Sequence, residues 1–510
     1  MNMTPKEMLG QMLAFGFHGT TLSEEFLSLI REYKIGNIIL FRRNVTDARQ
    51  MRELCSQIQT VVQAETGLPA FILIDQEGGM VSRLPNDAVT VPCAMSLAAT
   101  GDPENARVAS EITIRQLKGL GANFNMAPVL DVNNNPQNPV IGIRSFGDRT
   151  ELVSAFGIAS AQPYENSGII CCGKHFPGHG DTAVDSHLGI PQVNKTEEEL
   201  EQLELVPFRQ AIAAGIPSIM ISHVMFPHIE DRQIPCTMSR KIVTDLLKTK
   251  LGFKGLVLSD CMEMMAIQAH YGTPEGVVAA LQAGVDIAEI SSSITLQWAT
   301  AKAVNEAAAL GKLNMKEIKA SVERIIAYKQ QVATEIQQEL CNLPADQEAV
   351  LQLTKKAITC HAGTPFVADA DTFFCGCEDY RVSGVANDSA SIGPFPAYMG
   401  KVFFANYAVT SKDPDLQEIQ AVTAQAANHS KIVLATCNGH LFPGQIALAK
   451  ALAETGKPLM VVALRNPYDL PLLPSCTCSI AAYDYTGAAF QALEAVLKGE
   501  ETTGISPVAL

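Results

Sequence analysis

The chain has 510 residues, 47% hydrophobic and 18% charged, which is more than one ordinary domain needs and enough for sizeable cores. Its formal net charge of −15, spread along the chain, argues against nucleic acid or an anionic membrane as a partner. The first residues lack a basic segment followed by an apolar one, and no run approaches the ~18 apolar residues that span a bilayer. We therefore expect two domains, no membrane partner and a cytoplasmic location.

Short apolar runs alternate with amphipathic helical patterns in the first part of the chain. Eight runs are found, at residues 12–17, 36–41, 70–75, 122–126, 169–175, 218–223, 256–260 and 285–290. Helical patterns lie between them, at residues 24–33, 48–63, 104–117, 197–213, 240–250 and 274–281. Such repeated alternation of strand and helix predicts an α/β fold, a (β/α)₈ TIM-type barrel, which we assign to residues 1–334.

Polar residues stand where several of these predicted strands end. They are Asp75, Asp131, Lys174 with His175, Ser222 with His223, and Ser259 with Asp260. Because the carboxyl ends of barrel strands converge on one face, side chains that are distant in sequence would meet around one pocket. This pattern predicts an active site, although polar residues also occur wherever a loop begins.

The segment 174–187 concentrates three histidines, a lysine and two aspartates after a buried strand. Pro177, Gly178 and Gly180 disfavour regular structure there, so the polar groups are expected on a loop. A metal site, a general acid/base site and a polar loop without chemistry are all compatible with this composition. The histidines lack the helical i, i+4 spacing of a metal pair, whereas Asp185 could orient His187 for proton transfer.

The remaining sequence predicts a second, smaller domain. Further helical patterns at 296–310 and 315–332 precede a linker at 335–346, and residues 347–510 predict an αβα sandwich. Its strands are expected at 401–407, 431–436, 458–463 and 479–483, with helices such as 414–428 and 442–456. No G-x-G-x-x-G or P-loop supports a nucleotide site.

The chain contains thirteen cysteines, several of them in apolar strands. We interpret these cysteines as reduced core residues, with Cys171 and Cys172 as examples. The pairs Cys375-x-Cys377 and Cys476-x-Cys478 leave a metal site open, although their spacing is not the usual C-x₂-C.

The chain resembles the β-N-acetylglucosaminidase branch of glycoside hydrolase family 3, in its two-domain form. The resemblance rests on residues 40–44, 74–84, 125–131, 141–146, 174–187 and 259–264, and more weakly on 463–470 in the second domain. It implies a retaining exo-β-N-acetylglucosaminidase that removes terminal β-linked GlcNAc, with peptidoglycan-derived muropeptides as the expected substrate. The resemblance implies no cofactor and no metal, and it requires no catalytic residue from the second domain.

By this resemblance Asp260 is the nucleophile and His187, paired with Asp185, is the acid/base. A strand-end carboxylate can attack an anomeric carbon and form a covalent glycosyl-enzyme, although it could also serve only to cap the helix that follows. The resemblance further implies a set of substrate-binding residues, namely Asp75, Arg83, Arg144, Lys174, His175 and, as a weaker candidate, His223.

Two positions depart from the family pattern. Cys261 stands where many members have a second aspartate, and Glu289 lies in a strand that is usually aliphatic. We expect Glu289 to point outwards to the helix layer. Three alternative functions stay open: a β-N-acetylglucosaminide phosphorylase, a β-glucosidase-type member with a glutamate acid/base from the second domain, and a sugar-binding protein without turnover.

Overall fold

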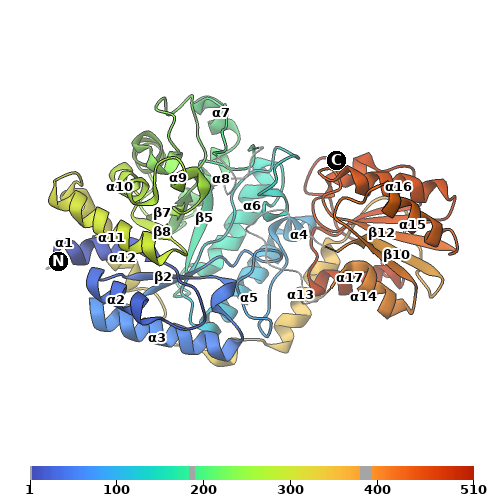
Figure 1. The fold of residues 1–510 in the computed structure, drawn as a ribbon, viewed down its shortest axis with the longest axis horizontal. Coiled ribbons are helices and arrows are strands. Elements are labelled where there is room, and N and C mark those ends of the chain that lie inside the picture. The colour runs from blue at the N-terminus through green and yellow to red at the C-terminus, as the bar shows by residue number, and fades with distance from the viewer. Residues whose placement is uncertain (1–2, 183–189, 379–392) are drawn as a thin grey trace.

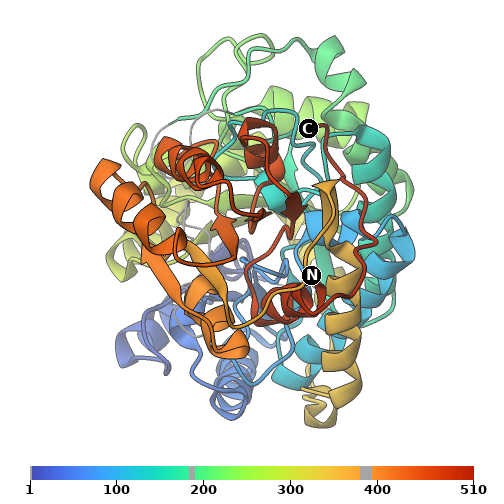
Figure 2. The same ribbon diagram turned by 90° about the vertical axis from the view of Figure 1, so that its right-hand side faces the viewer.

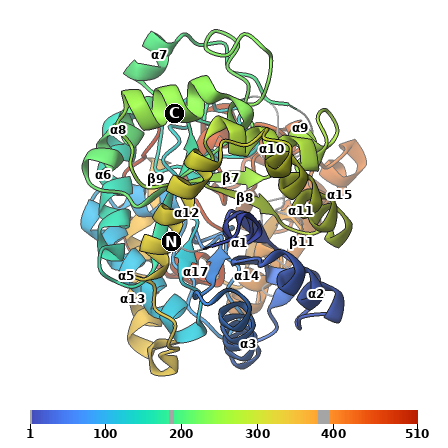
Figure 3. The same cartoon turned by 90° about the vertical axis from the view of Figure 1, so that its left-hand side faces the viewer.

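The computed structural model describes residues 3–182, 190–378 and 393–510. The N-terminal part is a closed barrel of eight parallel strands, in which β1 also pairs with β8 (Figures 1 and 3). The strands are β1 (Leu13–Phe15), β2 (Asn37–Leu40), β3 (Phe71–Ile74), β4 (Phe124–Asn125), β5 (Ile170–Phe176), β6 (Ser218–Ile221), β7 (Leu256–Cys261) and β8 (Ile287–Ile290). The predicted TIM-type barrel is therefore confirmed.

Helices surround this barrel, and short polar residues define where several of them begin. Ser23 and Asp47 accept hydrogen bonds from the first turns of α2 and α3, which satisfies backbone donors that have no partner inside the helix. The helices are α1 (Pro5–Gln11), α2 (Glu24–Tyr33), α3 (Ala48–Thr66), α4 (Ala94–Ala99), α5 (Pro103–Leu120), α6 (Thr150–Ala161), α7 (Glu197–Gln202), α8 (Leu205–Ala213), α9 (Met265–Gln268), α10 (Thr273–Ala283), α11 (Ile294–Ala309) and α12 (Met315–Lys329), with a π-helix at Lys241–Lys250. The single helix expected at 197–213 is thus divided into α7 and α8.

The C-terminal part is a sandwich around a six-stranded sheet, on the right of Figure 1. Its strand order is β11 (Tyr407–Thr410), β10 (Thr372–Cys377), β12 (Lys431–Thr436), β13 (Leu459–Ala463), β14 (Cys478–Ala481) and β9 (Thr359–Gly363), of which only β9 runs antiparallel to its neighbour. The helices of this part are α13 (Pro344–Ala357), α14 (Phe395–Phe403), α15 (Leu416–Ala426), α16 (Pro443–Glu454) and α17 (Gly487–Leu497).

Alternating side chains of the central strands divide between two apolar layers. In β12, Ile432 and Leu434 pack with α15 and α16, whereas Val433 and Ala435 pack with α14 and α17. This alternation follows from the two-residue period of a strand. The predicted αβα sandwich is therefore confirmed as a fold.

The prediction of a strand at 401–407 is wrong. Residues up to Phe403 belong to α14, and β11 begins only at Tyr407. A short apolar run has no periodicity that separates a strand from a buried helix segment, which explains the error. Strands β9 and β10 were not predicted.

The two parts of the molecule share an apolar cluster. Met80 and Met95, which follow β3, and Ile143, which follows β4, pack in the same cluster as the core of the sandwich. The thiol of Cys93 donates a hydrogen bond to the carbonyl of Tyr483 at 3.0 Å. Figure 1 shows the sandwich beside the barrel, and Figure 2 shows the molecule from the sandwich side. Among the described residues, no helix has both the length and the apolar character needed to cross a membrane.

Candidate active site

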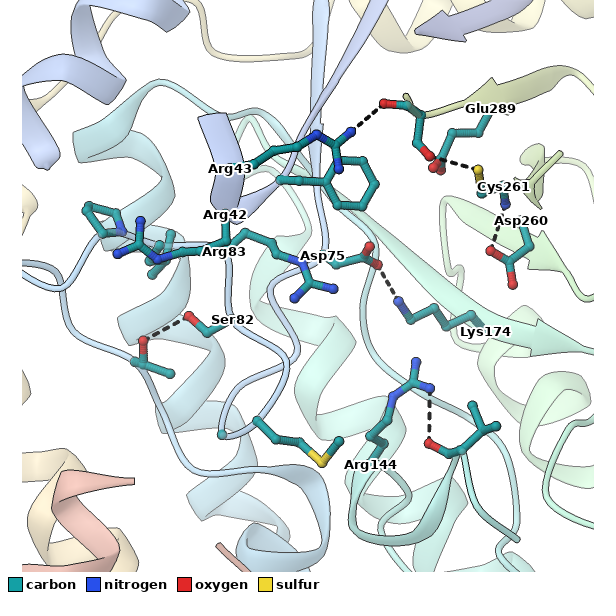
Figure 4. Close-up of a pocket in the computed structure, with 18 of the residues that line it drawn as sticks. Arg42, Arg43, Asp75, Ser82, Arg83, Arg144, Lys174, Asp260, Cys261 and Glu289 are labelled. Atoms are coloured by element: carbon teal, nitrogen blue, oxygen red, sulfur yellow. Dashed lines mark hydrogen bonds and ion pairs between the residues drawn. The ribbon is translucent and has the colours of Figure 1, made fainter. Parts of the chain in front are cut away.

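A cavity of about 2030 Å³ lies at the carboxyl ends of the barrel strands (Figure 4). Six of the residues predicted for the site line it: Asp75, Arg83, Arg144, Lys174, His175 and Asp260. The start of α17 and the residues before it complete the wall from the sandwich side, through Tyr485, Thr486, Gly487, Ala488 and Gln491. The structure therefore brings together residues from β3, β5 and β7 as strand convergence predicts.

A network of buried ion pairs forms one wall of this cavity. The Lys174 amine donates to Asp75 at 2.6 Å and lies 2.8 Å from Glu77. Arg144 donates two hydrogen bonds to Glu77, at 2.7 and 2.8 Å. Burial favours the neutral form of Glu77, but the charges of Arg144 and Lys174 outweigh this effect and lower its pKa. The network therefore presents a rigid set of charged hydrogen-bonding groups.

Asp131 organises the histidines at the end of β5. Its carboxylate lies 2.7 Å from Nδ1 of His175 and accepts a hydrogen bond from the backbone nitrogen of His179, also at 2.7 Å. Burial opposes the ionisation of Asp131, yet its pKa is lowered because the two histidines stabilise the charged form. Asp131 thus orients His175 and holds the first part of the following loop.

Side-chain contacts also hold that loop as far as residue 182. The Asn138 amide donates to the carbonyls of His179 and Gly180, at 2.8 and 3.0 Å. The hydroxyl of Thr182 lies 2.9 Å from Nδ1 of His179. Burial lowers the pKa of His179 to about 4, so its imidazole is neutral at pH 7. Asp185 and His187, predicted as the acid/base pair, lie outside the described residues.

Asp260 lies at the end of β7, and its side chain lines the cavity. One oxygen, Oδ1, accepts a hydrogen bond from the Cys261 nitrogen at 2.7 Å (Figure 4). The residue is partly exposed, so the carboxylate is accessible to a ligand in the cavity. This arrangement suits a nucleophile that is held in one orientation at the surface of the cavity.

His223 takes a different place from the other predicted site residues. It is fully buried and is not among the residues that line the cavity. Its Nδ1 lies 2.7 Å from the Thr237 hydroxyl, and its Nε2 lies 2.9 Å from the Cys261 carbonyl. These contacts connect the end of β6 to the chain beside Asp260, so the geometry gives His223 a supporting place behind the cavity wall.

The expectation that Glu289 points to the helix layer is wrong. Glu289 lines the cavity, and only 5% of its surface is exposed (Figure 4). On the same strand segment, Asp286 faces the helices, where it pairs with Lys248 and Arg324. Because strand residues alternate in direction, a side chain three positions later points to the opposite side, into the barrel.

Glu77 was absent from the predicted site residues, and Asp131 was predicted only as a polar strand-end residue without a role in binding or catalysis; both are buried partners of residues that were predicted. A sequence signal exists for both, because each lies at or just after the end of a predicted strand. The two cysteines of each Cys-x-Cys pair pack with different apolar clusters: Cys375 and Cys476 with one, and Cys377 and Cys478 with the other. Within residues 3–182, 190–378 and 393–510, no group of three or more His, Cys, Asp or Glu side chains has an arrangement that could hold a metal ion.

Comparisons with known proteins show which family the barrel sequence matches. Residues 4–328 match the model of the glycosyl hydrolase family 3 N-terminal domain. Beta-hexosaminidase A of Pseudoalteromonas piscicida is 35% identical over 366 residues, which cover 64% of this chain and 61% of that relative, less than two thirds of its length. A beta-hexosaminidase of Alkalilimnicola ehrlichii is 35% identical over 55% of this chain and 80% of its own.

Solved structures extend the likeness to both domains. A family 3 β-N-acetylglucosaminidase from Paenibacillus sp. str. FPU-7 superposes with a TM-score of 0.91, at 35% identity and over 99% of each chain. A β-glucoside phosphorylase superposes with a TM-score of 0.80 over 100% of this chain, but at 19% identity this likeness concerns the fold alone. With a family model that covers the whole barrel and a cavity at its strand ends, the chain belongs to glycosyl hydrolase family 3.

Proposed function

We propose that the protein is a retaining exo-β-N-acetylglucosaminidase that removes terminal β-linked GlcNAc. The observation that carries this proposal is one cavity lined by Asp260 together with the ion-pair network of Asp75, Lys174 and Arg144. A carboxylate beside a dense set of hydrogen-bonding groups suits attack on the anomeric carbon of a sugar whose hydroxyls are held in place. The likeness to a β-N-acetylglucosaminidase along nearly the whole chain supports this choice of sugar.

In the first step, Asp260 attacks the anomeric carbon and forms a glycosyl-enzyme, while His187 protonates the leaving oxygen. In the second step, His187 removes a proton from water, which attacks the anomeric carbon and releases Asp260. Asp185 would orient the His187 ring and stabilise its protonated form. These roles come from the family resemblance, and they are supported by the bonds that hold His179 and Gly180 to Asp131 and Asn138, a few residues before Asp185.

We further propose that the aglycone derives from peptidoglycan, that the natural substrates are muropeptides and that the protein acts in the cytoplasm. The sandwich would then contribute to the cavity wall without supplying an acid or base. We also propose the domain limits 1–334 and 347–510, joined by a linker at 335–346. In the structure α12 ends at Lys329, before that segment, and α13 begins at Pro344, near the end of it.

The central test is hydrolysis of p-nitrophenyl β-GlcNAc beside the corresponding glucoside. We expect release of β-configured GlcNAc from the first substrate, observed by NMR at early times, and much slower cleavage of the glucoside. Inverted product would contradict the retaining mechanism. The reaction is repeated in phosphate buffer, because accumulation of GlcNAc 1-phosphate would identify a phosphorylase instead.

A further inference from the structure

The Glu289 carboxyl group lies at the cavity but takes no part in the proposed mechanism. Glu289 lies on β8 opposite Cys261 of β7, directly beside the strand position of Asp260. It lines the cavity while 95% of its surface is buried. Within residues 3–182, 190–378 and 393–510, its carboxyl oxygens make no hydrogen bond and no ion pair.

The neighbouring glutamates differ in this respect. Glu77 is held by Arg144 and Lys174. Glu263 accepts hydrogen bonds from the backbone nitrogens of Ser292 and Ser293, at 2.6 and 2.7 Å. The carboxylates of Glu77 and Glu263 are therefore already bound by groups of the protein. Buried polar groups in native proteins are nearly always satisfied, so a buried carboxyl group that faces a cavity without a protein partner points to a ligand.

The charges around Glu289 determine which hydrogen bond it can offer. It faces the cavity groups Asp75, Asp260 and Lys174, the neighbouring Glu263 and Cys261, and more distantly Arg43 and Arg83. Burial and the negative charges of Asp75 and Asp260 outweigh Lys174, so the pKa of Glu289 is raised well above its usual value. A protonated carboxyl group donates one hydrogen bond and still accepts others.

We propose that Glu289 is a specificity-determining residue that donates a hydrogen bond to a polar substituent of the bound sugar, on the ring side next to the anomeric carbon. This inference rests on the proposed function, because Asp260 is taken to lie beneath that carbon. A side chain on the adjacent strand can reach the substituent at C2 or the hydroxymethyl group at C5. The ligand class is therefore a pyranoside with an amide or hydroxyl group at one of these positions.

A neutral acid is chemically suited to this position. Asp75 and Asp260 can only accept hydrogen bonds, whereas a sugar hydroxyl or amide carbonyl also needs a donor. Lys174 and Arg144 are donors whose charges are paired with Asp75 and Glu77, whereas an unpaired lysine or arginine at position 289 would oppose the oxocarbenium-like transition state with its positive charge. A protonated glutamate supplies the donor without that charge.

The test compares the full-length wild-type enzyme with Glu289→Gln and Glu289→Leu on three substrates: p-nitrophenyl β-GlcNAc, its 6-deoxy analogue and the 2-deoxy glucoside, which has no polar group at C2. For the wild type, changing the contacted substituent should reduce kcat/KM about tenfold through this one hydrogen bond. In Glu289→Leu, removal of the same substituent should no longer reduce kcat/KM. The mutation should therefore lower kcat/KM on substrates that carry this substituent and leave kcat/KM unchanged on the analogue that lacks it. Glu289→Gln, which keeps a donor of the same shape, should stay within about threefold of the wild type.

Glu323→Leu is the matched control, because it makes the same chemical change on the exposed face of α12. It should leave all three kcat/KM values unchanged. If Glu289→Leu loses the same factor on all three substrates, or loses nothing, the inference is overturned, since a purely structural defect does not distinguish substituents. Failure of the wild type to cleave p-nitrophenyl β-GlcNAc would instead overturn the proposed function.

Discussion

The side-chain oxygen of Asn466, in the sandwich, accepts a hydrogen bond from the backbone nitrogen of Ile143, in the barrel, at 3.0 Å. Ile143 is the middle residue of the turn Gly142–Arg144, which carries the arginine of the ion-pair network. Asn133 accepts from Gly142 at 3.1 Å and donates to the hydroxyl of Tyr468 at 2.7 Å. The sandwich therefore holds the Arg144 turn both directly and through Asn133.

Asn466→Ala should reduce kcat/KM on p-nitrophenyl β-GlcNAc by about tenfold, because the buried nitrogen of Ile143 loses its acceptor at a cost of ~1–3 kcal/mol and the turn can shift Arg144. Most of the change should appear in KM, since Arg144 is proposed to bind substrate. Asn428→Ala, an exposed substitution in the same domain, is the control. Unchanged kinetics for Asn466→Ala, with a normal unfolding transition, would exclude this positioning role.

A chain truncated after Glu339 should not form a stable barrel. From sequence, the second domain supplies no catalytic residue, so such a fragment is predicted to keep its chemistry wherever it folds. In the structure, truncation would expose the apolar surface of Met80, Met95 and Ile143. Size-exclusion chromatography and urea unfolding should therefore reveal aggregation or loss of a cooperative transition. A soluble, cooperative and active fragment would contradict this expectation.

Asp260→Asn should lower kcat by on the order of 10⁴-fold or more, as expected for loss of a catalytic nucleophile. The free energy of unfolding should change little, because the side chain is partly exposed and outside the apolar core. A mechanism-based fluoro-sugar should label Asp260 in the wild type, as read by peptide mass spectrometry. Labelling of Asp75 or Glu289 would refute the assignment.

His187→Ala should impair poor leaving groups far more than activated ones. General acid catalysis contributes about 10²–10⁴-fold, and a dinitrophenolate leaves with little need of a proton. Comparing kcat/KM on an alkyl glycoside and on the dinitrophenyl glycoside measures the difference, and Asp185→Asn should give a weaker version of the same pattern. Equal losses on both substrates would indicate a structural loop, and reactivation by zinc after chelation would indicate a metal site.

Protonation of His179 should destabilise the fold as the pH falls. Its pKa is about 4 in the folded protein and about 6.5 when unfolded, so between these values the unfolded state binds the extra proton. The stabilisation is complete above pH 6.5 and is lost progressively down to pH 4, by on the order of 3 kcal/mol.

Urea unfolding at pH 7 and pH 4.5 measures this loss for the wild type and for His179→Gln, which cannot titrate. His361→Gln, at an exposed position, is the control. The difference between the two pH values should be smaller for His179→Gln than for the wild type or the control. An identical pH dependence in all three proteins would show that His179 contributes nothing to it.

The sequence determined the barrel and much of its site. Strands of a parallel barrel are buried on both faces, so they read as continuous apolar runs that end where the loop face begins. Asp75, Lys174 and Asp260 could therefore be located from the predicted strand ends alone.

Tertiary structure decided the direction of side chains, the conformation of one apolar run and the contacts between the domains, which local sequence patterns leave open. Because both faces of β8 are buried, the sequence does not indicate which of Asp286 and Glu289 faces the helices, and the pairing of Asp286 with Lys248 and Arg324 settles this. The run at 401–407 is apolar in either conformation, and packing made it the end of a helix. The bond between Asn466 and Ile143 joins positions 323 residues apart, so no local pattern could predict it. Such long-range contacts depend on how the two domains pack, which is decided by the shape of the whole apolar surface.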